Sequence, residues 1–172
     1  MKLDGPRIET ERLLLRLPIQ ADFEGWCEMM GDEVAARHLG GVQAPAAVWR
    51  GMATIAGAWA LQGHSMFSVV ERSSGRWIGR VGPWRPHGWP GDEVGWGLVR
   101  SAWGNGYATE AARATMIWAR EHLGWTDIIH CIAPDNTASQ AVARRLGAVP
   151  RGPGRLPPPF ESAAIEIWGQ PR

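Results

Sequence analysis

Tyrosine, cysteine and net charge are scarce in this sequence of 172 residues. It has one tyrosine, two cysteines and a formal net charge of +1 at pH 7. The near balance of charge disfavours a wide basic surface, so we expect no nucleic-acid partner. Cys27 and Cys131 stand far apart, and no Cys/His spacing typical of a metal site is present. We therefore expect neither a disulfide framework nor a bound metal, and this cysteine usage fits a reducing cytoplasm.

Long apolar runs are absent as well. No uncharged apolar run reaches the roughly 18 residues of a membrane span, so we expect no membrane association. The first 17 residues carry charges throughout, unlike a secretory signal peptide. The composition is 45% hydrophobic and 20% charged, which is ordinary for a globular protein, and the length predicts one domain over residues 1–172. Most of the 11 tryptophans should therefore be core residues.

Hydrophobic periodicity predicts a mixed chain of strands and helices. Apolar alternation indicates strands at residues 8–17, 64–71, 76–84, 94–99, 127–133, 148–149 and 163–168. Helical spacing indicates helices at residues 23–30, 46–61, 107–123 and 137–146. Asp22 is placed to cap the first helix, and residues 31–45 and 152–159 have the composition of loops. The fold class is α/β (α+β), with a mainly antiparallel sheet of roughly six to seven strands, about four helices and one βαβ unit over residues 94–133.

Residues 94–123 join an apolar strand, a turn with glycines and a long amphipathic helix. Gly104 and Gly106 allow the backbone of the turn to approach a ligand closely. The free N–H groups and the partial positive charge at the start of the helix suit a phosphate. The third glycine of a dinucleotide-binding turn and the lysine of a P-loop are both missing. A plain turn, with glycines for geometry alone, is the alternative interpretation.

Three segments resemble the GNAT superfamily of N-acetyltransferases. Gly106-Tyr107-Ala108 is similar to the end of its acyl-CoA pyrophosphate loop, Gln/Arg-x-x-Gly-x-Gly/Ala, with Trp103 where Gln or Arg usually stands. Residues 136–148 are similar to a second element of that superfamily. Residues 9–16 are similar to the opening strand of the RimJ/RimL-type subgroup, which acetylates ribosomal-protein N-termini.

The resemblance covers nearly the whole chain and implies a single GNAT domain with two splayed, central, parallel strands. It implies direct transfer of acetyl from acetyl-CoA, as co-substrate, to a primary amine of a protein N-terminus or a small molecule, without a metal. The alternative is a non-catalytic acyl-CoA-binding or sensing module, because Trp103 departs from the pattern and the tyrosine that many relatives use as an acid is missing from its usual helix.

The resemblance also implies which residues contact acetyl-CoA. We assign the pantetheine to the backbone of residues 98–100 and 132–133, and the pyrophosphate to the N–H groups of residues 103–109. Arg100 and Arg144 either add charge there or make surface ion pairs only. The full set of expected contacts is Leu98, Val99, Arg100, Trp103, Gly104, Asn105, Gly106, Tyr107, Ala108, Thr109, Asn136, Ser139 and Arg144.

Catalysis needs a proton acceptor for the amine and a donor for the leaving thiolate. Glu93 is the first candidate for the base, with Asp92 as its competitor and an exposed strand-end carboxylate as the alternative. Ser139 is the candidate donor. A bulge over residues 95–98 would aim a backbone N–H at the thioester carbonyl, as the family does. His130, in an apolar strand, is expected to be a core histidine rather than a base.

The acceptor groove is expected between the first two helices, residues 86–90 and residues 152–159. Trp26, Trp84, Trp89 and Phe160 are the candidate substrate-binding residues. The sequence leaves the acceptor open among a protein N-terminus, a polyamine, an amino acid and an antibiotic amine. It also leaves open whether the chain forms a homodimer.

Overall fold

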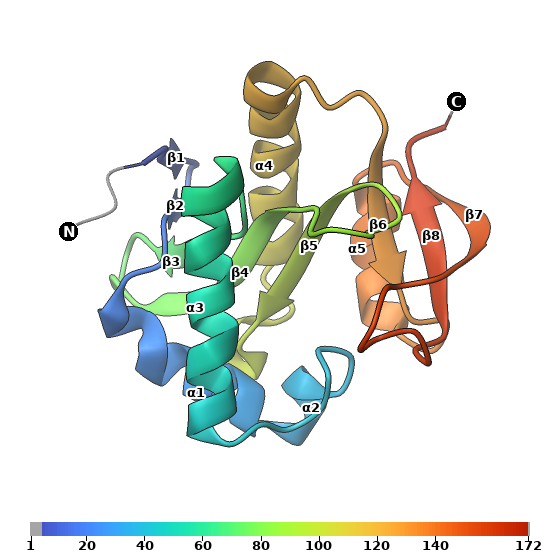
Figure 1. Ribbon diagram of the computed structural model, residues 1–172. Coiled ribbons are helices and arrows are strands. Elements are labelled where there is room, and N and C mark those ends of the chain that lie inside the picture. Colours follow the sequence, from blue (N-terminus) through green and yellow to red (C-terminus); the bar gives the residue numbers. More distant parts are fainter. Residues whose placement is uncertain (1–4, 172) are drawn as a thin grey trace.

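A single mixed sheet runs through the part of the chain that the computed structural model describes, residues 5–171. Residues 1–4, the start of the segment that we compared with signal peptides, and residue 172 lie outside it. Within those bounds the sheet has eight strands in the order β1-β2-β3-β4-β5-β6-β8-β7 (Figure 1). The strands are β1 (Ile8–Glu9), β2 (Leu13–Arg16), β3 (Phe67–Glu71), β4 (Trp77–Trp84), β5 (Asp92–Leu98), β6 (Ile128–Ile132), β7 (Val149–Gly154) and β8 (Ile165–Gly169). All paired neighbours are antiparallel except β5 and β6, which confirms the predicted fold class.

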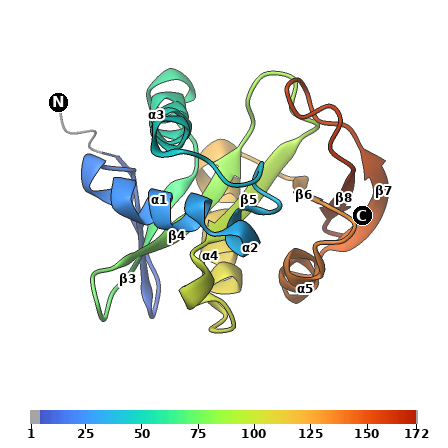
Figure 2. The same cartoon turned by 90° about the horizontal axis from the view of Figure 1, so that it is seen from below.

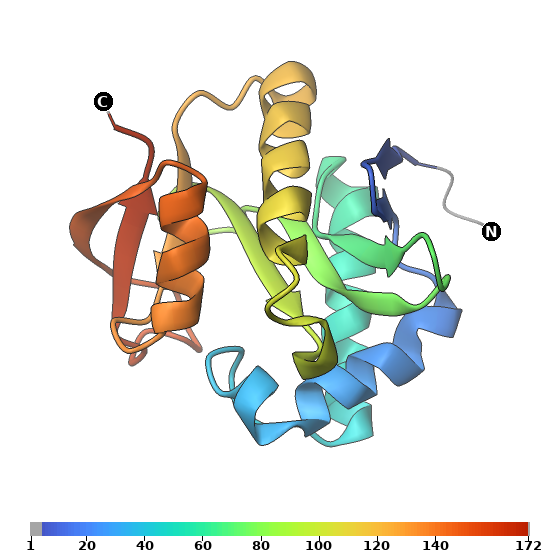
Figure 3. The ribbon, with the colours of Figure 1, turned by 180° about the vertical axis from the view of Figure 1, so that it is seen from behind.

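Helices cover both faces of the sheet. One face carries α1 (Phe23–Gly31), α2 (Glu33–Ala36) and α3 (Pro45–Gln62), and the other carries α4 (Tyr107–Leu123) and α5 (Thr137–Arg145) (Figures 2 and 3). Two short 3-10 turns, η1 (Gln20–Asp22) and η2 (Arg100–Ala102), precede α1 and the glycine-bearing turn. None of the described helices is long and apolar enough to cross a membrane.

The core lies between the sheet and each helical layer. The inward side chains of β2 and β3 are fully buried, as the apolar alternation predicts. Ala111, Ala112 and Ala119 line the buried face of α4, and their small side chains allow this helix to lie close to β4 and β5. Buried tryptophans contribute much of the remaining core, namely Trp26, Trp59, Trp77, Trp125 and Trp168.

Several local predictions were wrong. The strand expected over residues 8–17 is a hairpin, β1 and β2, because Thr10 N–H bonds the carbonyl of Leu13 and turns the chain back. Asp22 occupies the predicted N-cap position of α1, but its side chain makes no capping bond there, since its buried carboxylate accepts from Arg16 at 2.7 Å and from the Ser68 hydroxyl at 2.6 Å. The predicted loop over residues 31–45 contains α2, which Asp32 caps.

The proline- and glycine-rich segment, residues 152–159, is not a loop throughout, although the sequence predicts one. Its first residues, up to Gly154, extend β7, which lies at the end of the sheet. Proline lacks an N–H group, so a sheet tolerates it at such an edge, where one side of the strand needs no ladder bonds.

The predicted bulge over residues 95–98 is absent. β4 and β5 pair in unbroken register from Trp84↔Glu93 to Gly79↔Leu98. The glycines of β5 serve close packing instead: a Cβ on Gly95 would lie 2.9 Å from Met66 Cε, and one on Gly97 would lie 3.0 Å from Leu39 Cδ1. The sheet opens on the other side of β5, where the pairing with β6 ends after Glu93↔Ile129.

Candidate active site

A cavity of about 720 Å³ lies where β5 and β6 diverge, on the face that α1 and α3 cover. All four candidate substrate-binding residues line it: Trp26, Trp84, Trp89 and Phe160. Glu93, Asn136 and Ser139 line it as well. The structure therefore brings one predicted acetyl-CoA segment, both predicted catalytic residues and the predicted acceptor residues to a single cavity.

Glu93 is a buried carboxylate in the cavity wall, with 7% of its surface exposed. The Trp89 indole N–H donates to its Oε2, and the Cys131 backbone N–H donates to its Oε1 at 3.3 Å. Burial raises the pKa of Glu93, while these donors and the charge of Arg80 oppose the rise. Glu93 is thus not the exposed strand-end carboxylate of the alternative interpretation.

Asp92, the competing carboxylate, lies elsewhere. Successive side chains of a strand point to opposite faces, so the neighbour of an inward residue points away. Asp92 forms an ion pair with Arg85 at 2.5 Å and is not part of the cavity wall. Only Glu93 of the two can reach a molecule bound in the cavity.

Ser139 and Asn136 occupy the start of α5. The Asn136 Oδ1 accepts the Ser139 backbone N–H at 3.1 Å and so caps the helix. The Ser139 Oγ accepts the indole N–H of Trp96 at 3.2 Å. A hydroxyl that accepts this bond keeps its own proton for donation to another group. Because Ser139 lines the cavity, that group can belong to a bound ligand.

His130 joins β6 to β5 through its side chain. Burial lowers its pKa to about 4, so the ring is neutral at pH 7. Its Nδ1 lies 2.7 Å from the Val94 carbonyl oxygen, which can only accept, so Nδ1 carries the proton. The ring is 1% exposed and lies tilted against the Trp96 ring, with centroids 4.9 Å apart. The ring also lines the cavity, and its buried Nε2 has no partner among the described residues, so the expected role as a core histidine stays a prediction.

The divergence of β5 and β6 leaves backbone groups of Trp96 without a strand partner. The carbonyl of Val94 points towards His130 of β6. Along a strand, the backbone N–H and C=O groups of every second residue point to the same side, so those of Trp96 also point to the β6 side of β5. The Leu98 carbonyl points there too, but it accepts the Trp103 indole N–H at 3.0 Å. The Val99 N–H bonds Ile78 of β4. The free edge of β5 is therefore at Trp96, earlier than the predicted contacts at residues 98–100.

The same alternation applies to β6, whose predicted contacts Ile132 and Ala133 both line the cavity. The Cys131 N–H points towards β5, where it meets Glu93. The backbone of Ile132 consequently points to the opposite side, towards its partner Glu166 in β8. Cys131, rather than Ile132, presents its backbone to the space between the diverging strands.

Residues 103–109, which we call the glycine turn, follow η2 and include the first residues of α4. Gly104 and Gly106 have φ of +79° and +78°, a left-handed conformation that favours glycine. Within the described residues, the backbone N–H groups of residues 104–109 have no acceptor, and the buried Thr109 Oγ1 has no partner. Unpartnered donors at the start of a 17-residue helix fit a pyrophosphate.

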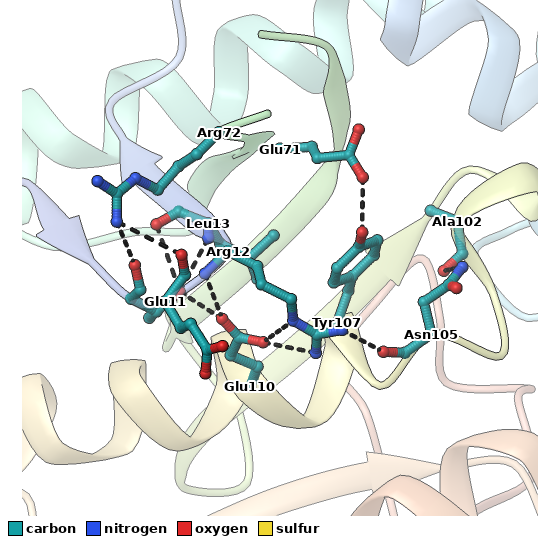
Figure 4. A network of polar contacts seen from close by, with 10 residues as sticks. Glu11, Arg12, Leu13, Glu71, Arg72, Ala102, Asn105, Tyr107 and Glu110 are labelled. Carbon is teal, nitrogen blue, oxygen red and sulfur yellow. Dashed lines mark hydrogen bonds and ion pairs between the residues drawn. The ribbon is translucent and has the colours of Figure 1, made fainter. Parts of the chain in front are cut away.

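Arg12 is the cation beside the glycine turn, a position that the sequence analysis did not assign. Its guanidinium donates to the Asn105 carbonyl at 2.9 Å, pairs with Glu110 at 2.6 Å and stacks over the Tyr107 ring (Figure 4). Tyr107 donates its hydroxyl to Glu71 at 2.6 Å. The motif at residues 9–16 includes Arg12, but a motif match alone does not predict which residues its guanidinium contacts.

The two arginines proposed for charge make other contacts. Arg100 lies 3.6 Å from Asp32 at the start of α2. Arg144 lies over the ring of Trp168, 5.0 Å from its centroid. Within the described residues, no ion pair or side-chain hydrogen bond joins either arginine to the glycine turn, so their role towards acetyl-CoA stays a prediction.

Comparisons with known proteins agree with this geometry. Residues 12–149 match the family described as acetyltransferase (GNAT) domain. The chain therefore belongs to the GNAT acetyltransferase family. The match includes β2 to β6, the glycine turn and α5, and so most of the elements that line the cavity, but not the segment after β7 that carries Phe160.

Solved structures extend the likeness to the whole fold. An acetyltransferase from Agrobacterium tumefaciens str. C58 is 28% identical, with a TM-score of 0.83 over 100% of this chain and 98% of that one. RimL, a ribosomal L7/L12 alpha-N-protein acetyltransferase in complex with coenzyme A, is 15% identical, with a TM-score of 0.75 over 96% of this chain and 97% of that one. At such identity RimL shows the fold alone.

Among curated proteins, YkkB of Bacillus subtilis (strain 168) is 32% identical over 87 residues. That stretch is 49% of this chain and 51% of YkkB, so the match spans about half of either protein. YkkB is described as an uncharacterized protein, so the match names no acceptor.

Proposed function

We propose that this chain transfers the acetyl group of acetyl-CoA directly to a primary amine, on a small molecule or at a protein N-terminus. The observation that carries the proposal is Glu93, a buried carboxylate with a raised pKa in the wall of a cavity that the diverging strands form. GNAT family membership supports the reaction class. Acetyl-CoA, when bound, supplies an activated acetyl group.

Binding would use the glycine turn and the free edge of β5. The N–H groups of residues 104–109 are available for the pyrophosphate, and the α4 dipole favours negative charge there. Glu110 is an acidic residue in the first turn of α4, but its pairing with Arg12 offsets that charge. The Trp96 N–H is available for the thioester carbonyl, as an oxyanion-hole donor would be.

Proton transfer would use Glu93 and Ser139. An amine that arrives protonated must lose a proton before it attacks, and Glu93 accepts it directly or through a water molecule. A raised pKa makes the ionised carboxylate a stronger base, because base strength follows the pKa. Ser139 keeps a free hydroxyl proton for the thiolate, and Trp96 holds the oxygen in place.

The test is Glu93→Gln, compared with the matched neighbour Asp92→Asn. We expect Glu93→Gln to lower kcat/KM for the amine by about 100-fold at pH 7, since general-base catalysis contributes at this scale. Acetyl-CoA affinity should stay unchanged, and Asp92→Asn should retain activity because Asp92 pairs with Arg85 outside the cavity. An unchanged pH–rate profile in Glu93→Gln would exclude Glu93 as the base.

A non-catalytic acyl-CoA-binding module is the second candidate. One observation favours it: Tyr107, the only tyrosine of the chain, donates its hydroxyl to Glu71 at 2.6 Å and is not part of the cavity wall. Tight acetyl-CoA binding by calorimetry, without acetylation of any amine in a broad panel, would favour this candidate over the enzyme.

A further inference from the structure

Arg80 is an inward-facing cation of the cavity wall that lacks a carboxylate partner among the described residues. Its Nη1 donates to the Met66 thioether sulfur at 2.6 Å, its guanidinium lies 5.2 Å from the centroid of the Trp26 ring, and its buried Nε has no partner. A thioether is only a weak acceptor and an aromatic ring carries no net charge. The guanidinium therefore lies among apolar groups.

The other partly buried arginines of the described residues have carboxylate partners. Arg16 and Arg151 keep 19% and 17% of their side chains exposed, and each pairs with an aspartate at 2.7 Å. Burial lowers the pKa of Arg80 to about 10, so it remains charged at pH 7. Removing a charge from water is costly unless an opposite charge and hydrogen bonds compensate it. Among the described residues, Arg80 has no carboxylate at ion-pair distance, and the hydrogen bond that it donates goes to a weakly accepting thioether sulfur.

Strand register places Arg80 on the same face as Glu93. The pairs Trp84↔Glu93, Gly82↔Gly95 and Arg80↔Gly97 alternate with pairs that point to the other face. Arg80 and Glu93 thus flank a stretch of sheet whose two central residues are glycines without side chains, against which Met66 packs. A molecule bound in the cavity, over this stretch and the Met66 side chain, would have the candidate base at one end and a guanidinium at the other.

Two loops meet beside the part of the cavity that Trp89 and Phe160 line, where the acceptor is expected. The loop between β4 and β5 approaches the segment after β7, so that a Cβ on Gly88 would lie 3.3 Å from Pro157 Cβ (Figure 2). Trp89 from the first loop and Phe160 from the second segment line the cavity. This enclosure favours a small acceptor over a polypeptide.

We propose that Arg80 binds a carboxylate of the acceptor, so that the acceptor is a small amino carboxylate such as an amino acid or a close derivative. The planar guanidinium matches a carboxylate through two parallel hydrogen bonds, and the unpartnered Nε together with a terminal nitrogen can supply them. The amine of the same molecule then lies on the Glu93 side. This inference rests on the proposed acetyl transfer and names the substrate class of the same site.

The first test compares matched acceptors. Acetylation is measured for glycine, β-alanine, γ-aminobutyrate and phenylalanine, each beside its carboxamide, and for short peptides with neutral or acidic side chains. For the best pair we expect the carboxylate to exceed the carboxamide at least about tenfold in kcat/KM, the scale of one charged contact. Arg80→Met should abolish that ratio, while Arg80→Lys keeps part of it.

The control is Arg85→Met, which removes an arginine just after β4 that is 56% exposed and pairs with Asp92. It should keep the wild-type ratio. The ratio is measured within each variant, so a loss of folded protein scales both acceptors equally. The inference is wrong if the wild type does not prefer the carboxylate, if Arg80→Met keeps the preference, or if only peptides are acetylated.

A second measurement does not need turnover. The Nε–H signal of Arg80 in ¹⁵N-labelled protein with coenzyme A, identified by its loss in Arg80→Met, should shift on titration with the amino carboxylates and not with their carboxamides. No shift with any of the carboxylates would overturn the inference. The absence of acetylation for every amine would instead overturn the proposed acetyl transfer, and the Nε–H titration would still decide the role of Arg80.

Discussion

Adjacent residues have opposite environments at the start of β5. Asp92 is ion-paired outside the cavity, whereas Glu93 is enclosed by Trp89, the Cys131 N–H and the field of Arg80. The pleat of the strand determines which of the two faces the cavity. Sequence alone could name the pair, but the choice between them depends on which face of β5 the cavity occupies.

Glu93 should stabilise the fold only at low pH. Because burial raises its folded-state pKa above the ordinary 4.5, the folded protein holds this proton more tightly than the unfolded chain does. That contribution is complete below pH 4.5 and is lost as the pH rises through the folded-state pKa. Glu93→Gln, whose amide oxygen can still accept from Trp89, should therefore raise Tm by a few degrees at pH 8 and leave it nearly unchanged at pH 4. Thermal unfolding followed by circular dichroism across this range measures the difference, and a Tm below wild type at pH 8 would contradict the argument.

At the scale of elements, the glycine turn is held by a hairpin that lies far away in the sequence. Arg12, between β1 and β2, contacts the Asn105 carbonyl and Glu110, and Thr10 donates its hydroxyl to the same carboxylate at 2.6 Å. The network in Figure 4 thus connects the edge of the sheet to the start of α4. The hairpin orders the turn and keeps the negative charge of Glu110 paired beside the candidate phosphate site.

Arg12→Ala should weaken coenzyme A binding by about tenfold, because it frees the Asn105 carbonyl and leaves Glu110 uncompensated near the phosphates. Adding Glu110→Gln should recover part of that loss, which a double-mutant cycle by isothermal titration calorimetry measures. Arg72→Ala is the matched control, since Arg72 bonds the Thr10 carbonyl of the same hairpin without touching the turn. Equal losses in Arg12→Ala and Arg72→Ala would mean that the hairpin matters only for folding.

The predictions that succeeded rest on local chemistry. The helical spacing of α3 and α4, the glycine turn and the Asn136 cap all follow from residues within a few positions of one another. The failures involve distant partners. The sequence predicts a capping side chain at Asp22, but in the fold its carboxylate accepts hydrogen bonds from Arg16 and Ser68. The residues next to Arg80 in the sequence likewise do not predict its contacts with Trp26 and Met66.

At the scale of the whole molecule, the sheet consists of two halves with a narrow connection. β1 to β5 form one half and β6, β8 and β7 the other, and two residue pairs join them, Asp92↔Ile128 and Glu93↔Ile129. Two side-chain bonds continue the connection beyond those pairs: His130 to the Val94 carbonyl, and the Cys131 N–H to Glu93. The proposed site lies where the halves part, so the same side chains that join the halves also border the cavity.

This connection should make global stability fall at moderately acidic pH. The pKa of His130 is lowered from 6.5 to about 4 in the folded protein, so between these values the unfolded chain binds the extra proton and folding is disfavoured as the pH falls. At 1.36 kcal/mol per pKa unit, the whole window corresponds to about 3 kcal/mol.

His130→Gln keeps a neutral donor for the Val94 carbonyl and removes the titration. The free energy of unfolding, measured with urea from pH 7 to pH 4, should fall by about 3 kcal/mol more in wild type than in His130→Gln, because carboxylates common to both proteins cancel in the comparison. Parallel pH dependences in the two proteins would show that His130 does not govern the connection between the halves.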